Sequence, residues 1–496
     1  NTALAISYDS TRLAKGCFGR GWYHNYEKHV EMTECGARVY SSPSVYSTYI
    51  CRDNCSEYTC TTPSKNGYVL TVDCSREYPY VIHCNSDHTE YYNCDGKLGK
   101  IVDHQGFATL ISYSGNIITV TDTVSGKKLH LQKDATGKVV RVYDDNSRQA
   151  TFTYSDDLLV GICDLKGNTM SYTYNCDGQV LTGVDANGTC YFTNTYDECG
   201  RVSTQKDGIS DSLVTVFRYE GNKRITTDRN GNQSTRVFDN NGSLVSFTDE
   251  NGNTKTYSYD ARYNIIKETD ALGNSVSKTY NAFNKPTSVT DKNGNTTYYS
   301  YDHIGNVIKV RYPETDGVIP EESFAYNSRN QLVRHTDLRG TVTVYGYDSS
   351  AMPSSKKTGS KAAVNFSYQN GLLKSQTDSN GNTTTYGHNA IGQVISVTNA
   401  AGKVTTYEYD AAGNLTKAVD ANGKSVITTY DGNNQKTSVT DANGNKTEYA
   451  YNGNMKNICV TLPDDNTVSY EYDGEDRVIK EIDQAQTATV THYDKA

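Results

Sequence analysis

The residues best placed for chemistry are the carboxylates and amides of a short motif, Asp-Ala-Asn-Gly-Asn, at residues 441–445. Such oxygen-rich clusters can bind calcium, but an EF-hand loop needs glycine at its sixth position and glutamate at its twelfth. Counting from Asp441 places Gly444 at the fourth position and Asn452 at the twelfth. Aspartate and asparagine side chains also support tight turns by bonding nearby backbone. We therefore interpret the motif as a turn and expect no bound metal.

The acidic residues do not form a recognisable catalytic site. There are 57 Asp and Glu residues, so some carboxylate pairs must fall in the range of roughly 5–9 Å used by glycoside hydrolases. A catalytic pair should be singular, whereas these positions recur in every copy of the motif. The ten histidines are scattered, and the sequence has no Gly-x-Ser-x-Gly, His-Glu-x-x-His or phosphate-binding glycine loop. We predict no catalytic residues, no cofactor and no enzymatic activity.

Eight of the 13 cysteines lie between Cys17 and Cys94. Four of them have the spacing C-x3-C-x4-C-x13-C, which is not a standard zinc pattern; they are Cys51, Cys55, Cys60 and Cys74. Disulfides in an exported protein are the favoured interpretation, and free thiols in the protein of an anaerobe are the alternative. Eight cysteines allow 105 pairings, so the sequence does not define the connectivity.

Two markers recur with a period of 21 residues. The aspartate of the turn motif occurs at Asp228, Asp249, Asp270 and Asp291, and again at Asp420 and Asp441. A closing tyrosine occurs at Tyr259, Tyr280, Tyr301, Tyr409, Tyr430, Tyr451, Tyr472 and Tyr493. A fixed period of this length is the signature of a repeat array.

Each repeat is predicted to be two antiparallel strands and two turns. Asn443-Gly444, between two alternating runs, predicts a type I′ hairpin turn with positive φ at both residues. Tyr449 and Tyr451 are two residues apart, which places both rings on one face of the sheet. Residues 409–414 predict a second, longer turn that begins with aspartate and contains a left-handed glycine.

The chain is expected to have two parts. Residues 1–90 form a cysteine-rich opening segment that contains Trp22, and His24 beside it is interpreted as a packed or surface imidazole. Residues 91–496 form the repeat array, which is still in register at its last residues. Because the sequence starts at Asn1 and stops at Ala496, we expect a piece of a longer polypeptide. No run of 18 apolar residues predicts a membrane span.

Composition limits the architecture. Acidic residues outnumber basic residues 57 to 48, which does not favour a nucleic-acid surface. Ile, Leu, Val and Phe make up only about 18% of the chain. Roughly 19 repeats would give about 38 strands, far more than the roughly 10 strands that a twisted open sheet accommodates. We therefore predict an all-β protein whose sheet coils into a spiral wall around a hollow or separately filled interior.

The repeats resemble the YD repeats of RHS-repeat proteins. The resemblance rests on Tyr-Asp-x-x-Gly hairpins joined by Thr-Asp-x-Asn-Gly-Asn turns, and on Phe18-Gly19-x-Gly21-Trp22-x-His24-Asn25-Tyr26, which is similar to the start of the RHS core. The family includes bacterial wall-associated polymorphic toxins, the cocoon of insecticidal Tc toxins, and teneurins.

The resemblance implies a secreted or cell-wall-associated bacterial protein whose hollow β-shell encloses its own C-terminal toxin. Bacterial members often carry an Asp-Pro-x-Gly self-cleavage segment, which this sequence lacks, so neither cleavage nor toxicity is assigned to any residue. An alternative function is adhesion, because exposed tyrosines with nearby amides could bind glycans. Tyrosines that face solvent would favour adhesion, and tyrosines that face an interior or a neighbouring layer would favour a container.

Overall fold

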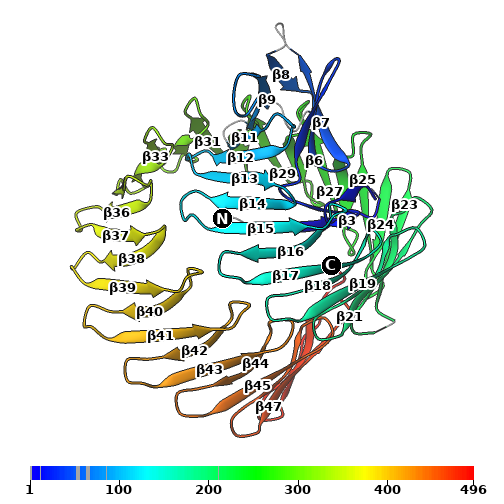
Figure 1. Ribbon diagram of the computed structural model, residues 1–496, viewed down its shortest axis with the longest axis vertical. Coiled ribbons are helices and arrows are strands. Elements are labelled where there is room, and N and C mark those ends of the chain that lie inside the picture. The colour runs from blue at the N-terminus through cyan, green and yellow to red at the C-terminus, as the bar shows by residue number, and fades with distance from the viewer. Residues whose placement is uncertain (1–2, 12, 52–55, 63–66, 85–86, 211) are drawn as a thin grey trace. The chain divides into compact units, whose positions relative to one another are not determined.

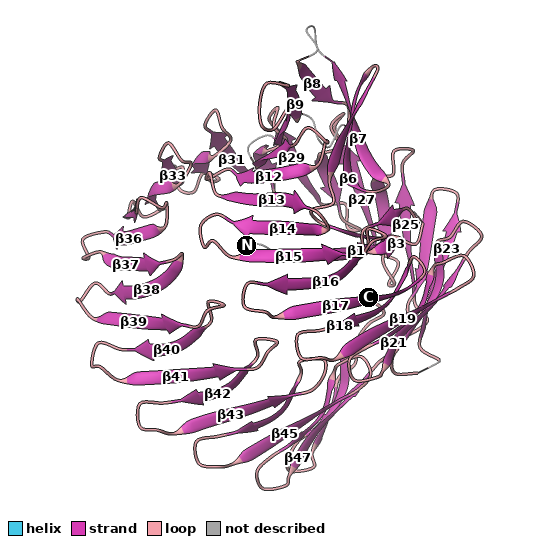
Figure 2. Cartoon of the chain, in the orientation of Figure 1, coloured by secondary structure: helices cyan, strands magenta, loops and turns pink. Residues whose placement is uncertain are grey.

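The computed structural model describes the chain except residues 1–2, 12, 52–55, 63–66, 85–86 and 211. Every element of regular secondary structure in the described residues is a β-strand (Figure 1, Figure 2). The chain divides into two compact units. Unit 1 comprises Asn1–Ser7, Tyr23–Gly137 and Lys255–Tyr386, and unit 2 comprises Tyr8–Trp22, Lys138–Thr254 and Gly387–Ala496. The prediction of an all-β protein is confirmed.

Four short strands come first: β1 (Ile6–Tyr8), β2 (Lys15–Gly16), β3 (Gly19–Arg20) and β4 (Trp22–His24). Unit 1 then contains β5 (His29–Thr33), β6 (Gly36–Ser42), β7 (Val45–Cys51), β8 (Glu57–Cys60), β9 (Val69–Val72), β10 (Tyr80–Cys84), β11 (His88–Tyr92), β12 (Leu98–Asp103), β13 (Ala108–Ser114), β14 (Ile117–Asp122) and β15 (Lys128–Lys133). Its second run is β27 (Thr254–Tyr259), β28 (Ile265–Thr269), β29 (Ser275–Tyr280), β30 (Pro286–Thr290), β31 (Thr296–Tyr301), β32 (Val307–Arg311), β33 (Glu321–Tyr326), β34 (Leu332–Thr336), β35 (Val342–Tyr347), β36 (Pro353–Thr358), β37 (Val364–Gln369), β38 (Leu372–Thr377) and β39 (Thr383–His388).

Unit 2 contains β16 (Val139–Asp144), β17 (Gln149–Ser155), β18 (Leu158–Cys163), β19 (Thr169–Tyr174), β20 (Val180–Val184), β21 (Cys190–Tyr196), β22 (Val202–Asp207), β23 (Val214–Glu220), β24 (Lys223–Thr227), β25 (Gln233–Phe238) and β26 (Leu244–Thr248). Its second run is β40 (Val394–Thr398), β41 (Val404–Tyr409), β42 (Leu415–Val419), β43 (Ser425–Tyr430), β44 (Lys436–Thr440), β45 (Lys446–Tyr451), β46 (Asn457–Thr461), β47 (Thr467–Tyr472), β48 (Val478–Ile482) and β49 (Ala488–Val490). Within each run of either unit, the strands pair antiparallel in chain order.

Two turns of the same construction bound each regular hairpin. In residues 441–445, the amide of Asp441 donates to the carbonyl of Asn445 at 2.9 Å, and the amide of Gly444 donates to the carbonyl of Asp441 at 3.1 Å. Residues 410–414 form the same two bonds, both at 3.0 Å. One turn geometry therefore serves both edges of the sheet.

The prediction of a type I′ turn at Asn443-Gly444 is wrong. That turn needs positive φ at both residues, but only Gly444, at 91°, is in the left-handed region. The loop is instead the longer form predicted for residues 409–414. The cause is the first residue: a carboxylate oxygen of Asp441 accepts the amides of Asn443 and Asn445 at 2.8 and 2.9 Å, which holds five residues together rather than two.

The predicted alternation of faces is confirmed. In β45, Tyr449 and Tyr451 are half-buried, whereas Glu448 and Ala450 are exposed. Both tyrosines therefore lie on one face, as period-two geometry requires.

Buried apolar side chains are concentrated early in the chain. Within the described residues they run from Cys17 to Val180, and beyond Val180 only Val310 and Ala351 join them. Examples in unit 1 are Leu70 and Leu131; in unit 2, Phe18 packs edge-to-face on Phe152, with ring centroids 5.0 Å apart. The later repeats are thus half-buried sheet, with little aliphatic core of their own.

Candidate functional site: interlocking turns in unit 2

The second tyrosine of each pair fastens its strand to the hairpin before it. The hydroxyl of Tyr451 donates to the carbonyl of Lys436 at 2.8 Å, and that of Tyr472 donates to the carbonyl of Asn457 at 2.6 Å. Each of these carbonyls belongs to the first residue after a turn. Burial raises the pKa of the Tyr451 hydroxyl, which keeps it a donor. Equivalent bonds come from Tyr113, Tyr154, Tyr174, Tyr280, Tyr301, Tyr347, Tyr409 and Tyr430.

Three successive turns of unit 2, residues 431–435, 452–456 and 473–477, depart from the usual turn sequence. Their glycine stands at the second position rather than the fourth. The fourth position is nevertheless left-handed, and a residue with a side chain occupies it: Asn434, Met455 and Asp476, with φ of 63°, 61° and 61°. In these turns glycine does not occupy the left-handed position, where backbone conformation favours it. Its presence at the second position therefore needs another explanation.

That reason is close approach to a second row of turns. A Cβ on Gly432 would lie 2.7 Å from the carbonyl oxygen of Ala186, and a Cβ on Gly453 would lie 2.1 Å from that of Gly208. Gly474 is equally confined, with a side-chain oxygen 2.6 Å from its Cβ position. Only glycine allows backbone to come this near.

We call these facing rows the seam. One row comprises residues 164–168, 185–189, 207–210 and 228–232, and the other comprises residues 431–435, 452–456 and 473–477. The hydrogen-bonded partners are more than 240 positions apart in the chain, for example 244 for Asn187 and Asp431.

The middle of the seam is a reciprocal set of amide bonds. The Asn187 side chain donates to the Asp431 carboxylate at 2.9 Å and accepts the Gly432 amide at 2.9 Å. In return, the Asn433 side chain donates to the Asp185 carboxylate at 2.6 Å. The two turns thus satisfy each other's polar groups, which fixes their register.

Further along the seam, Arg229 lies between three carboxylates. Its guanidinium contacts Asp207, Asp476 at 3.0 Å and Glu475 at 3.3 Å, and the Asn454 side chain also donates to Asp207 at 2.8 Å. Burial alone would lower the pKa of Arg229, but the carboxylates outweigh it and raise that pKa. Burial likewise opposes ionisation of Asp207, yet backbone amides, Asn454 and Arg229 hold its pKa below the ordinary value. The single positive charge of Arg229 is therefore fully paired, and it offsets part of the negative charge of the three carboxylates.

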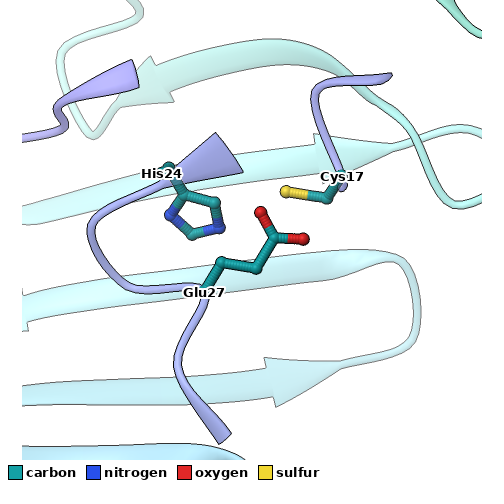
Figure 3. Close-up of side chains that lie close together, drawn as sticks. All are labelled: Cys17, His24 and Glu27. Atoms are coloured by element: carbon teal, nitrogen blue, oxygen red, sulfur yellow. The ribbon is translucent and has the colours of Figure 1, made fainter. Parts of the chain in front are cut away.

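Of the residues weighed from the sequence, His24 is packed in unit 1. It is 2% exposed, its Nδ1 accepts the Tyr26 amide at 3.3 Å, and burial lowers its pKa to about 4. Its ring and the Glu27 carboxylate come within 4.8 Å of each other (Figure 3). Cys17, also labelled there, belongs to unit 2.

The four-cysteine pattern does not become a metal centre in the described chain. Cys55 lies outside the described residues. Cys51 and Cys60 lie on β7 and β8, Cys74 is exposed, and no metal-type group among the described side chains includes these three. Disulfides are the favoured interpretation of the sequence, but six exposed cysteines are free thiols in the structure: Cys35, Cys74, Cys94, Cys176, Cys190 and Cys199.

The seam was not predicted. The sequence does carry a signal for it: three turns, spaced by 21 residues, begin with Asx-Gly-Asn or Asp-Gly-Glu. They start at Asp431, Asn452 and Asp473. The tyrosine hydroxyl bonds were also missed, although the register of the tyrosines was visible. No helix in the described residues is long and apolar enough to cross a membrane.

The repeats have relatives among known proteins. The RHS Repeat family matches residues 388–425, and the Teneurin YD-shell family matches residues 215–357. A curated relative, the tRNA3(Ser)-specific nuclease WapA of Bacillus spizizenii, is 25% identical over 272 residues, which cover 45% of this chain and 11% of the relative.

Two solved structures have a similar fold. One is TcdB2-TccC3 without its hypervariable C-terminal region, with a TM-score of 0.55 and 13% identity, covering 92% of this chain and 29% of that one. The other is the Photorhabdus luminescens Tc holotoxin pore with a TccC3 mutation, with a TM-score of 0.54 and 13% identity, covering 94% and 29%. This chain thus spans less than a third of either structure. The resemblance found in the sequence is confirmed: parts of the chain match the RHS Repeat and Teneurin YD-shell families, and its fold is similar to that of the two Tc-toxin structures.

Proposed function

We propose that this chain is the non-catalytic wall of a bacterial toxin shell, which encloses and delivers an effector carried on the same polypeptide, C-terminal to the repeats. The proposal includes secretion of the complete protein. Enclosure, delivery and secretion are properties of a complete protein, and this chain covers only a part of each larger relative.

The seam is the observation that carries the proposal. A wall made of hairpins leaves a row of turns along each edge, and a container needs those edges to meet. In unit 2, turns more than 240 residues apart meet through side-chain bonds such as Asn187 to Asp431 and Asn433 to Asp185. Glycines at 432, 453 and 474 remove the side chains that would hold them apart. A free binding surface has no use for such a contact.

The relatives support the cargo part of the proposal. One is named as a tRNA-specific nuclease, and one structure is described as lacking a hypervariable C-terminal region. Repeats with this fold therefore occur in proteins that carry a variable or nucleolytic part. The seam, for its part, joins its polar groups to one another, with Arg229 neutralised by carboxylates, which favours a structural role over catalysis.

The repeat tyrosines fit a wall better than a glycan platform. Tyr449 and Tyr451 are half-buried, and the Tyr451 hydroxyl is already bonded to backbone. A stacking platform requires an open ring face, and hydroxyls committed to backbone are not available to a sugar. Adhesion is therefore the outcome that the experiment has to exclude.

The test is protease protection of the complete gene product. The region C-terminal to the repeats should be cleaved roughly tenfold or more slowly than the same region expressed alone, because cleavage follows the population of opened protein. Equal cleavage rates, or glycan-array binding by the repeat array with no protection, would overturn the proposal in favour of adhesion.

A further inference from the structure

The hairpin of β10 and β11 in unit 1 brings a thiol, an imidazole and a carboxylate together. Cys84 and His88 are direct cross-strand partners, and Glu90 lies two residues after His88 on the same strand. Directly opposed residues, and residues two apart on a strand, project from the same face. The donor atoms of Cys84, His88 and Glu90 all lie within 4.8 Å of one another.

The site is buried and supported from behind. Cys84 is 3% exposed and Glu90 is 5% exposed. One oxygen of Glu90 accepts the hydroxyl of fully buried Tyr92 at 2.6 Å, while the other faces His88 Nε2 at 3.2 Å. Metal ligands are characteristically oriented by such outer hydrogen bonds.

A positively charged side chain already lies at this site. The Lys28 ammonium lies 2.5 Å from the Glu90 oxygen that also faces His88. The Lys28 side chain is 27% exposed, so its ammonium has a route to solvent. A metal cation that binds Cys84 and His88 as well as Glu90 could displace the Lys28 ammonium.

We propose that Cys84, His88 and Glu90 bind a divalent transition metal, with zinc as the cation that suits this donor set. Zinc takes thiolate, imidazole and carboxylate ligands at about 2.0–2.3 Å in a tetrahedral arrangement, and a fourth position can be water. Donor atoms within 4.8 Å require only small side-chain movements to reach that geometry. Binding releases the thiol proton of Cys84 and moves the Lys28 ammonium to solvent. The proposal replaces the expectation, drawn from the sequence, of no bound metal, and it is independent of the shell function.

The site would brace the cysteine-rich first part of unit 1. It ties the two strands together next to their turn, since Cys84 and His88 are the last paired residues before it. Metal binding should therefore raise the thermal stability of the protein, because a ligand that binds only the folded state stabilises it.

The experiment loads the purified protein, comprising residues 1–496, with Zn²⁺ and, separately, with Co²⁺. After gel filtration, wild type and the control Cys94→Ser should each retain one equivalent of zinc, and Cys84→Ser and His88→Gln should retain none. Cys94 is a matched control because it is an exposed turn cysteine. The cobalt form should show a thiolate-to-metal absorption band that Cys84→Ser lacks, and Tyr92→Phe should weaken binding by roughly 10–100-fold.

The wild-type measurement alone can overturn the proposal. If folded wild type retains no zinc, or if Cys84→Ser and Cys94→Ser retain equal amounts, there is no such site. His88→Gln, which changes a half-buried position, keeps the test valid if Cys84→Ser fails to fold.

Discussion

At the scale of single residues, the tyrosine hydroxyls act as fasteners between consecutive hairpins. Tyr451→Phe removes the bond to the Lys436 carbonyl and should lower the free energy of unfolding by about 0.5–1.5 kcal/mol, the net value of one hydrogen bond. The matched control is Tyr449→Phe, which changes the neighbouring ring on the same face. Denaturant unfolding checks both variants. Equal losses for the two would contradict the fastening role of the second tyrosine.

Glycines in this chain serve two different purposes, and a pair of variants separates them. Gly444 has φ of 91° with nothing within 4 Å of its Cβ position, so Gly444→Ala should cost about 1–2 kcal/mol of left-handed strain within its own hairpin. Gly432 is not left-handed, but a Cβ there meets the Ala186 carbonyl at 2.7 Å. Gly432→Ala should therefore open the seam.

Hydrogen exchange measures the difference. Gly432→Ala should speed exchange of amides in both facing turns, including residues 185–189, whereas Gly444→Ala should affect only its own neighbourhood. Exchange at residues 185–189 that is the same in the two variants would contradict the role of Gly432 in close approach.

At the scale of elements, strands and turns were predictable because they follow local rules. The 21-residue period, the tyrosine pairs and the aspartates define strands, faces and turn positions from neighbours in the chain. The turn at Asn443-Gly444 was assigned the wrong type because the pair signals type I′ only when no preceding side chain competes. Here the Asp441 carboxylate gathers two further amides and selects the longer loop.

The seam and the Cys84–His88–Glu90 cluster could not be predicted from the sequence, for a physical reason. The seam joins residues about 245 positions apart, such as Asn230 and Gly474, and no local pattern specifies which turns meet. The cluster becomes visible only when the strand register places Cys84 opposite His88. Displaced glycines and a C-x3-H-x-E spacing were the available signals, and neither is meaningful before the fold is known.

The seam should weaken in acid. The pKa of Asp207 is lowered in the folded protein, so its contribution is complete above the unfolded value of about 3.9 and is lost as the pH falls through the lower folded value. Arg229, Asn454, Glu475 and Asp476 surround this contact. The protection of the seam amides, which is their exchange relative to the intrinsic rate at the same pH, should fall below about pH 4, and Asp207→Asn should lower it already at neutral pH.

Asp441→Asn is the matched control for this acid effect. Asp441 also has a lowered pKa, chiefly because of its hydrogen bonds to Asn445 and Asn443, and its turn, residues 441–445, lies outside the seam. Its variant should loosen its own hairpin and leave exchange at residues 207–210 unchanged. A seam that is indifferent to pH between 7 and 3, or equally disturbed by both variants, would show that the charges at Arg229 do not hold it.

At the scale of the whole molecule, the proposed container should fail where its edges meet. Leucine at Gly432 and Gly453 places large side chains where even a Cβ would lie 2.7 and 2.1 Å from facing carbonyl oxygens. The hairpins themselves should survive, because neither glycine has positive φ. In a repeat protein, damage is largely confined to neighbouring repeats, so circular dichroism should remain that of a β-protein while the seam opens.

The most direct measurement is the protease resistance of the region C-terminal to the repeats in the complete protein, compared between wild type and Gly432→Leu/Gly453→Leu. If the repeats are a wall closed by the seam, wild type protects that region, and the double variant exposes it to cleavage while its repeats stay folded. If the region is cleaved at the same rate in both proteins, the seam does not close a container and the central claim is contradicted.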